Sequence, residues 1–304
     1  MTPPDSTSQP SLKVEDEDTI FNLIPPQGLI LLSIIAIQVG ASIAVQLFPI
    51  LGIEGTVAVR IIFSAIILVM TVNVKMHSLW QTFLDNWAML CLFGICMVAM
   101  NFFFYKALAR IPLGAVVAIE FIGPLSLAAI TSKRLIHFLW VVLAAFGILL
   151  LSPISGANLD TWGIIFALIA GMGWTTFIIL SKRVGKKVKG NRGLTIAMLI
   201  ASIFMIPFFV PVVPVLFQDP YVLFIGFCVA LLATSIPFTL EFQALKHLSH
   251  SAYGVLISLE PAIAALVGIV VLNEQITIQG IVAVICVVVA AIGITLSEKR
   301  DAKN

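Results

Sequence analysis

Residues 193–213 read GLTIAMLIASIFMIPFFVPVV, a stretch of 21 residues without a charged side chain. About 20 consecutive apolar residues let one helix cross the hydrocarbon core of a bilayer. Similar runs recur throughout the 304 residues, of which 60% are hydrophobic and 11% charged, and the mean hydropathy is +1.12. A soluble domain spends about a quarter of its residues on charge. The sequence therefore predicts an all-α membrane protein, without a polar stretch long enough for a large soluble catalytic or nucleic-acid-binding domain.

Ten such runs predict ten transmembrane helices. Helices are preferred over the strands of a β-barrel, because these runs are continuously apolar for about 20 residues whereas barrel strands alternate over about ten. Residues 1–26 are polar and rich in Pro, Ser and acid, so we expect a disordered tail. The expected spans are 27–48, 55–74, 86–106, 111–131, 136–153, 161–181, 193–213, 220–242, 249–272 and 277–297.

The basic residues predict the orientation of the chain, because Lys and Arg stay on the cytoplasmic side during insertion. With the N-terminus inside, 14 of the 17 Lys and Arg residues fall in cytoplasmic segments, including the run from Lys182 to Arg192. Lys106 and Arg110 fall outside, and Arg60 falls within a span. We therefore expect both termini, including the tail 298–304, in the cytoplasm, and read the basic run as a topological anchor instead of a nucleic-acid site.

The two halves of the chain share a short pattern. Residues 105–108 (YKAL) match residues 242–245 (FQAL), and at the same offset Pro124 matches Pro261. Five spans per copy, an odd number, would insert the copies in opposite orientations. The sequence thus predicts two inverted five-helix repeats, at 27–153 and 154–297, an arrangement typical of secondary transporters that hold substrate near the midplane.

Two acidic residues lie deep within expected spans. Glu120 is about 14 Å into its helix and Glu260 about 16 Å, at 1.5 Å per residue. Ionisable groups in hydrocarbon are costly and usually functional. Pro124 and Pro261 would each leave a helix carbonyl without its amide partner, so these helix breaks suit binding of an ammonium group or carriage of a proton. The alternative is that each acid makes one structural contact between helices.

Arg60 lies five residues into its span, where it could bind a substrate carboxylate as a fork or pair with a nearby acid. Glu241 lies near the cytoplasmic end of its span and needs little burial there, so a gate or pairing role is the weaker hypothesis. Further polar candidates for a cavity lining, which could equally be contacts between helices, are Gln38, Ser42, Asn101, Tyr105, Trp174, Ser235, Tyr253 and Ser258.

Neither a metal site nor an ATP-driven pump is expected. His247 and His250 have a suggestive spacing but flank a predicted loop and lack further ligands nearby. A phosphate-binding Gly-rich loop and a nucleophile elbow are also missing from the sequence. We therefore expect no cofactor.

Several segments, taken together, resemble the drug/metabolite transporter superfamily in its ten-helix branch with two EamA-type repeats. They are residues 37–42 (IQVGAS), 101–105 (NFFFY), 119–124 (IEFIGP), 237–241 (PFTLE) and 259–262 (LEPA). Within this branch, the chain is similar to threonine/homoserine exporters of bacterial inner membranes. The resemblance implies outward transport of small amino acids in exchange for protons, and it carries over as pocket or coupling candidates Gln38, Arg60, Asn101, Tyr105, Glu120, Trp174, Glu241 and Glu260.

We therefore expect a secondary exporter of small amino acids, not an enzyme, that works by proton antiport and alternating access. An exporter of broader metabolite or drug specificity with the same fold is the alternative, and the two differ in whether lipophilic cations compete with threonine. A channel-like protein would show no saturable flux driven by a pH gradient. A membrane enzyme would need catalytic groups clustered at an interface, which the sequence does not show.

Overall fold

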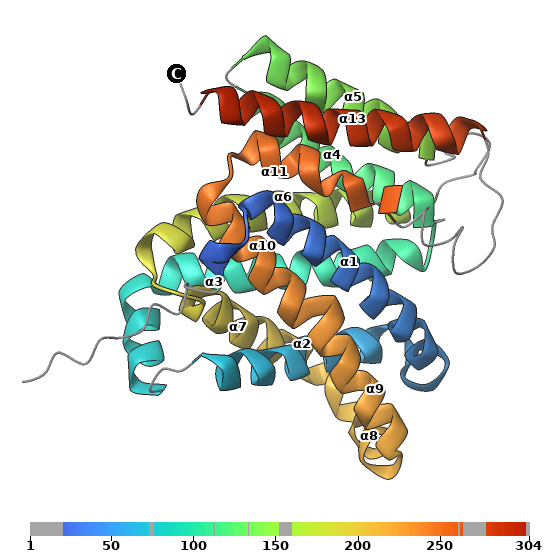
Figure 1. The fold of residues 1–304 in the computed structure, drawn as a ribbon. Helices are drawn as coiled ribbons and strands as arrows, with labels where there is room; N and C mark the ends of the chain where they lie inside the picture. Colours follow the sequence, from blue (N-terminus) through green and yellow to red (C-terminus); the bar gives the residue numbers. More distant parts are fainter. Residues whose placement is uncertain are drawn as a thin grey trace, which may run out of the picture.

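Every regular element that the computed structural model describes is a helix (Figure 1). The described residues are 21–72, 76–111, 113–132, 134–151, 160–260, 262–263 and 278–301. The α-helices are α1 (Pro26–Ala44), α2 (Phe48–Thr71), α3 (Met76–Leu108), α4 (Leu113–Thr131), α5 (Leu135–Leu151), α6 (Thr161–Lys187), α7 (Arg192–Phe209), α8 (Val213–Gln218), α9 (Pro220–Ala230), α10 (Ile236–His247), α11 (His250–Ile257) and α13 (Ile278–Asp301). Single turns are η1 (Phe21–Leu23), η2 (Val45–Leu47), η3 (Val210–Val212) and the π-helical turn η4 (Leu231–Ser235).

The chain is a multi-pass membrane protein. Seven of the described helical segments are long and apolar enough to cross a bilayer, and the segments 115–131 and 135–150 are shorter apolar helices. These nine segments match nine of the ten expected spans. The remaining expected span, 249–272, starts with α11 and continues beyond the described residues. Most of the expected N-terminal tail also lies outside them, and the ten-helix inverted repeat stays a prediction.

Two helices begin earlier than the hydropathy predicts. α2 starts at Phe48 instead of residue 55 and includes a break at Gly52, where φ is 68° and ψ is 170°. α3 starts at Met76 instead of residue 86 and bends at Asn86. The segment before Asn86 mixes polar residues with Trp80 and Phe83, so its hydropathy is too low to read as a span although its backbone is helical.

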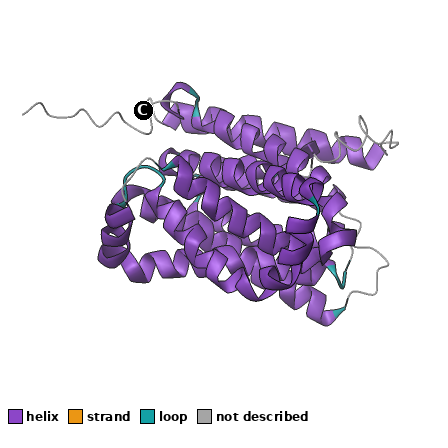
Figure 2. Ribbon diagram, turned by 90° about the horizontal axis from the view of Figure 1, so that it is seen from below, coloured by secondary structure: helices purple, strands orange, loops and turns teal. Residues whose placement is uncertain are grey.

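The helices pack as a bundle in which α6 lies against both α3 and α4, α1 lies against α10, and α2 lies against α7 (Figure 1). α5 and α13 pair along one side of the bundle, next to α11 and α4. Seen from the perpendicular direction, the described chain is helical throughout, with short connecting loops (Figure 2).

An aromatic cluster holds α3, α6 and α10 together at the centre of the bundle. The rings of Phe93 and Phe177 stack at 5.6 Å between centroids, and Phe93 also stacks on Phe242 at 6.2 Å. Phe177 is in turn 5.4 Å from Phe238. Offset aromatic pairs of this kind add to the packing between helices. They fix α10, and with it Glu241, against the bundle core.

Glycines bring α4 and α6 into backbone contact beside Glu120. A Cβ atom added at Gly171 would lie 2.6 Å from the carbonyl oxygen of Glu120, and one added at Gly123 would overlap the carbonyl of Gly171. Small residues allow this approach because helices in a membrane associate through close packing. Gly254 of α11 likewise lies against the carbonyl of Pro124 on α4. The acidic segment of α4 is thus enclosed by α6 and α11.

Candidate functional site

The carboxylate of Glu241 is the centre of a buried hydrogen-bonded cluster. Ser33 Oγ of α1 donates to Glu241 Oε1 at 2.7 Å, and the Tyr253 hydroxyl of α11 donates to Oε2 at 2.7 Å. Glu241 is only 2% exposed, and Ser33 and Tyr253 are fully buried. Two hydroxyl donors satisfy a charged acceptor strongly in a dry environment. The cluster therefore ties α1, α10 and α11 to one carboxylate.

We expected Glu241 to lie near the end of its helix and to need little burial, and the structure shows that this expectation is wrong. The hydropathy placed the end of the span at residue 242, whereas α10 continues to His247. The π-helical turn η4 joins α9 to α10 without interrupting the span, so Glu241 lies more than a turn inside the helix. Single π-helical turns within α-helices are frequent at functional sites.

Glu120 and Glu260 extend the cluster across the bundle. Glu120 of α4 is 8% exposed and interacts electrostatically with Glu260, and Glu260 interacts electrostatically with Glu241. Glu260, in the segment after α11, therefore lies between Glu120 of α4 and Glu241 of α10 in this chain of interactions. Like charges at short range in a low-dielectric region repel strongly, so such a group favours binding of a cation or a proton.

Glu120, Glu241 and Glu260 together are called the acidic cluster below. Aromatic side chains line this cluster on the side of α6. The Trp174 indole lies near the Tyr253 hydroxyl, and its ring meets Phe121 edge-on at 4.9 Å between centroids. Phe121 follows Glu120 directly in α4. The structure thus brings together five of the predicted site residues, namely Glu120, Trp174, Glu241, Tyr253 and Glu260.

A second polar group forms between α2 and α3 around Arg60. Its guanidinium donates to Asn101 Oδ1 and, at 3.3 Å, to the Tyr105 hydroxyl, and it lies over the Tyr105 ring. Nε of Arg60 is buried without a hydrogen-bond partner among the described residues. The salt bridges within the described chain join other residues, so a carboxylate partner from these residues is missing. Arg60 therefore keeps the capacity to bind an anion.

The Arg60 group and the acidic cluster are linked through η4. Ser64, one helical turn after Arg60 on α2, lies 2.8 Å from Ser235 Oγ, and both hydroxyls are buried. Ser235 also donates to the carbonyl of Ala230, five residues earlier. The wide turn η4 therefore contacts α2 at one end and leads into the helix of Glu241 at the other.

The remaining predicted residues do not join either group. Ser42 is exposed and donates to the carbonyl of Gln38, and no side-chain hydrogen bond of Gln38 is found within the described part of the chain. Ser258 is buried but donates to the carbonyl of Val255 in its own helix. α4 continues through Pro124, and Pro261 lies outside the described residues.

Sequence reasoning missed Ser33, which holds the Glu241 carboxylate. One serine in an apolar helix such as α1 gives little signal, because a serine is tolerated in a span at modest cost. Its i, i+4 neighbours are apolar, so no polar face marks it. Only the contact with α10 reveals its role.

Comparisons with known proteins agree with this architecture. Residues 161–296 match the EamA-like transporter family. The threonine/homoserine exporter RhtA of Salmonella typhimurium LT2 is 34% identical over 291 residues, covering 91% of this chain and 93% of that protein. The threonine/homoserine exporter RhtA of Escherichia coli K12 is 32% identical over 289 residues, covering 91% and 94%.

A solved crystal structure, 14% identical in sequence, superposes with a TM-score of 0.74 over 90% of this chain and 98% of that one. At that identity the likeness shows the fold alone. The curated relatives are exporters and not enzymes, and the identity to them extends over nine-tenths of the chain. The chain therefore belongs to the EamA-like transporter family.

Proposed function

We propose that this protein exports small amino acids such as threonine and homoserine across a bacterial inner membrane, in exchange for protons. The observation that carries the proposal is a cluster of three carboxyl groups: those of Glu120 on α4 and Glu241 on α10, which are buried, and that of Glu260 in the segment after α11. Buried acids of this kind are the usual proton and cation sites of secondary transporters. The relatives named as threonine/homoserine exporters support the substrate class.

An α-amino acid needs partners of both signs. The three carboxyl groups suit its ammonium, and Arg60, whose neighbours Asn101 and Tyr105 are neutral, suits its carboxylate. A guanidinium binds a carboxylate through two parallel hydrogen bonds. A carrier of lipophilic cations would not need Arg60 to remain without an acidic partner, so this feature favours a zwitterionic substrate.

Proton antiport and alternating access follow from the same group of acids. A proton and a substrate ammonium compete for carboxylates that repel one another, so binding of one favours release of the other. Because Glu241 bonds to both α1 and α11, a change in its charge alters how these helices are held. We further propose ten helices in two inverted repeats, with both termini in the cytoplasm, so that rocking of one repeat opens the site to alternate sides.

The test is efflux of radiolabelled threonine from proteoliposomes containing the purified protein. The proposal predicts saturable efflux that an inwardly directed proton gradient accelerates and that homoserine, but not a lipophilic cation, inhibits. Glu120→Gln or Glu260→Gln is expected to abolish the acceleration, whereas Asp85→Asn, which neutralises an exposed acid, is the matched control. Wild-type rates and pH dependence in both variants would refute the coupling, and inhibition by lipophilic cations would favour a broader exporter.

A further inference from the structure

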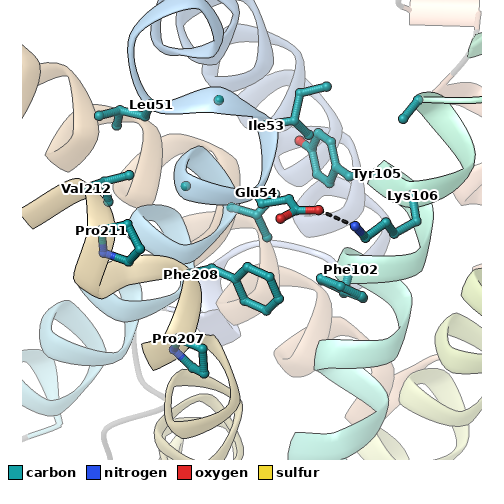
Figure 3. Close-up of a pocket in the computed structure, with 14 residues that line it drawn as sticks. Leu51, Ile53, Glu54, Phe102, Tyr105, Lys106, Pro207, Phe208, Pro211 and Val212 are labelled. Carbon is teal, nitrogen blue, oxygen red and sulfur yellow. Dashed lines mark hydrogen bonds and ion pairs between the residues drawn. The ribbon is translucent and has the colours of Figure 1, made fainter.

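A cavity of about 460 Å³ lies between α2, α3 and the end of α7 (Figure 3). Its lining includes none of Glu120, Glu241 and Glu260. Phe102, Phe208 and Val212 supply apolar walls, and Glu54 and Lys106 are the charged residues of its lining. This volume lies within the range of about 300–1,000 Å³ that is usual for small-molecule sites. The cavity can thus hold a small amino acid.

The two charged residues of the cavity pair with each other. Lys106 Nζ donates to Glu54 Oε1, and it also lies 5.3 Å from the centre of the Phe102 ring (Figure 3). The side chains are 38% and 44% exposed. An ion pair with this exposure is screened by water and contributes little to stability, so a ligand that offers both charges can replace it at little cost.

The backbone around the cavity is broken on two sides. α2 is kinked at Gly52, which has a positive φ, and a Cβ atom added there would meet no atom within 4 Å. Pro207 lies inside the last turn of α7, and Pro211 follows in η3. Each proline removes an amide donor and loosens the helix ladder. These walls can therefore move apart more easily than continuous helices.

The cavity also adjoins the Arg60 group. Tyr105 lines the cavity, and its hydroxyl accepts the hydrogen bond from Arg60. A carboxylate leaving Arg60 would therefore pass Tyr105 before it reached Lys106, which lies next in the same helix. The two cations provide successive sites for one negative group.

We propose that this cavity is a second binding site for the zwitterionic amino acid, in which the substrate ammonium takes the place of Lys106 at Glu54 and the substrate carboxylate binds Lys106. This inference rests on the proposed function and adds a site through which substrate passes between the Arg60 group and one face of the membrane. The exchange of ion pairs leaves neither Glu54 nor Lys106 without a partner of opposite charge, so the free-energy cost of substrate entry stays small.

The experiment compares Glu54→Gln and Lys106→Gln with wild type in threonine exchange, measured separately from the two faces of oriented vesicles. Because both side chains are half-exposed, loss of one charged contact with the substrate should raise half-saturation by roughly twofold to fivefold. We expect this rise on one face only, with the half-saturating concentration on the other face and the thermal unfolding midpoint unchanged. Arg110→Gln is the matched control, because Arg110 forms a similarly exposed pair with Asp160 that does not line the cavity.

Two analogues test the chemistry of the site. In wild type, a hydroxy acid without the ammonium and an amino alcohol without the carboxylate should each compete more weakly than threonine from the face that the cavity serves. In Glu54→Gln, which no longer binds an ammonium, the hydroxy acid should compete as well as threonine. In Lys106→Gln, which no longer binds a carboxylate, the amino alcohol should compete as well as threonine. If each analogue competes as weakly against threonine in both variants as it does in wild type, the proposal is overturned.

The remaining outcomes separate this site from the proposed function. Exchange by wild type with unchanged half-saturation in both variants, or an equal rise in Arg110→Gln, would overturn the second site alone. An effect seen only in vesicles containing phosphatidylethanolamine would assign the cavity to a zwitterionic lipid headgroup instead. No threonine exchange by wild type would overturn both.

Discussion

Gly171→Ala places one methyl group at the contact between α6 and α4 that positions Glu120. The added Cβ would lie 2.6 Å from the Glu120 carbonyl oxygen and 3.2 Å from its Cα. Non-bonded carbon atoms are best separated by about 3.5–4.0 Å, so the two helices must move apart by roughly 1 Å. Both close atoms belong to the backbone, and rotation of a side chain cannot relieve the overlap.

The cost of this overlap can be set from packing energetics. Inserting a methyl group into a close-packed contact costs about 1–3 kcal/mol. Because the displaced segment carries Glu120 itself, we expect Gly171→Ala to lower both the thermal unfolding midpoint in detergent and the rate of proton-driven threonine efflux, the rate by roughly tenfold or more.

The matched control is Gly226→Ala, where the three atoms nearest to the added Cβ belong to the side chains of Val59, Phe63 and Leu216, the closest at 3.0 Å. Side chains yield more easily than backbone, so we expect a smaller change in unfolding midpoint and efflux near the wild-type rate. Unchanged midpoint and efflux in Gly171→Ala, or an equal loss in Gly226→Ala, would refute the conclusion that backbone contact between α4 and α6 positions the acid.

Three further substitutions test other parts of the account. Tyr253→Phe removes the hydroxyl that donates to Glu241, which should lower the free energy of unfolding by about 1.5–3 kcal/mol. We expect a lower thermal unfolding midpoint together with an altered pH profile of efflux. An unchanged pH profile would show that the hydrogen bond is purely structural. Arg60→Lys keeps the charge but loses the planar fork, so the half-saturating concentration of threonine should rise about tenfold or more while the unfolding midpoint stays unchanged. A half-saturating concentration equal to that of wild type would show that Arg60 does not bind the substrate. Gly52→Ala forces a side chain into a region of φ and ψ that is essentially restricted to glycine, at a cost of about 1–3 kcal/mol; a wild-type unfolding midpoint would contradict the kink.

The sequence predicted the spans well because a helix in lipid must hide about 20 residues of backbone, and hydropathy reports that length directly. It failed where helices run beyond the apolar region. The start of α3 carries polar residues, and α10 continues to His247 past the predicted end of the span. Both errors concern the polar ends of helices, which hydropathy does not detect.

The candidate site was also predicted only in part. Depth along the helix placed Glu120 and Glu260 well inside their expected spans, and the Glu120 side chain is buried in the structure. The burial of Glu241 could not be foreseen, because it depends on the extra turn of α10 and on hydroxyls from two other helices. Single residues such as Ser33 acquire a role only through tertiary contact, for which hydropathy and spacing carry no signal.

Proton movement driven by threonine tests the central claim most directly. Proteoliposomes loaded with threonine and a pH-sensitive dye, diluted into threonine-free buffer without an imposed pH gradient, should acidify inside as threonine leaves and protons enter. The account predicts acidification in wild type and in Asp85→Asn, and its loss in at least one of Glu120→Gln and Glu260→Gln. Threonine efflux by wild type without any acidification would contradict it.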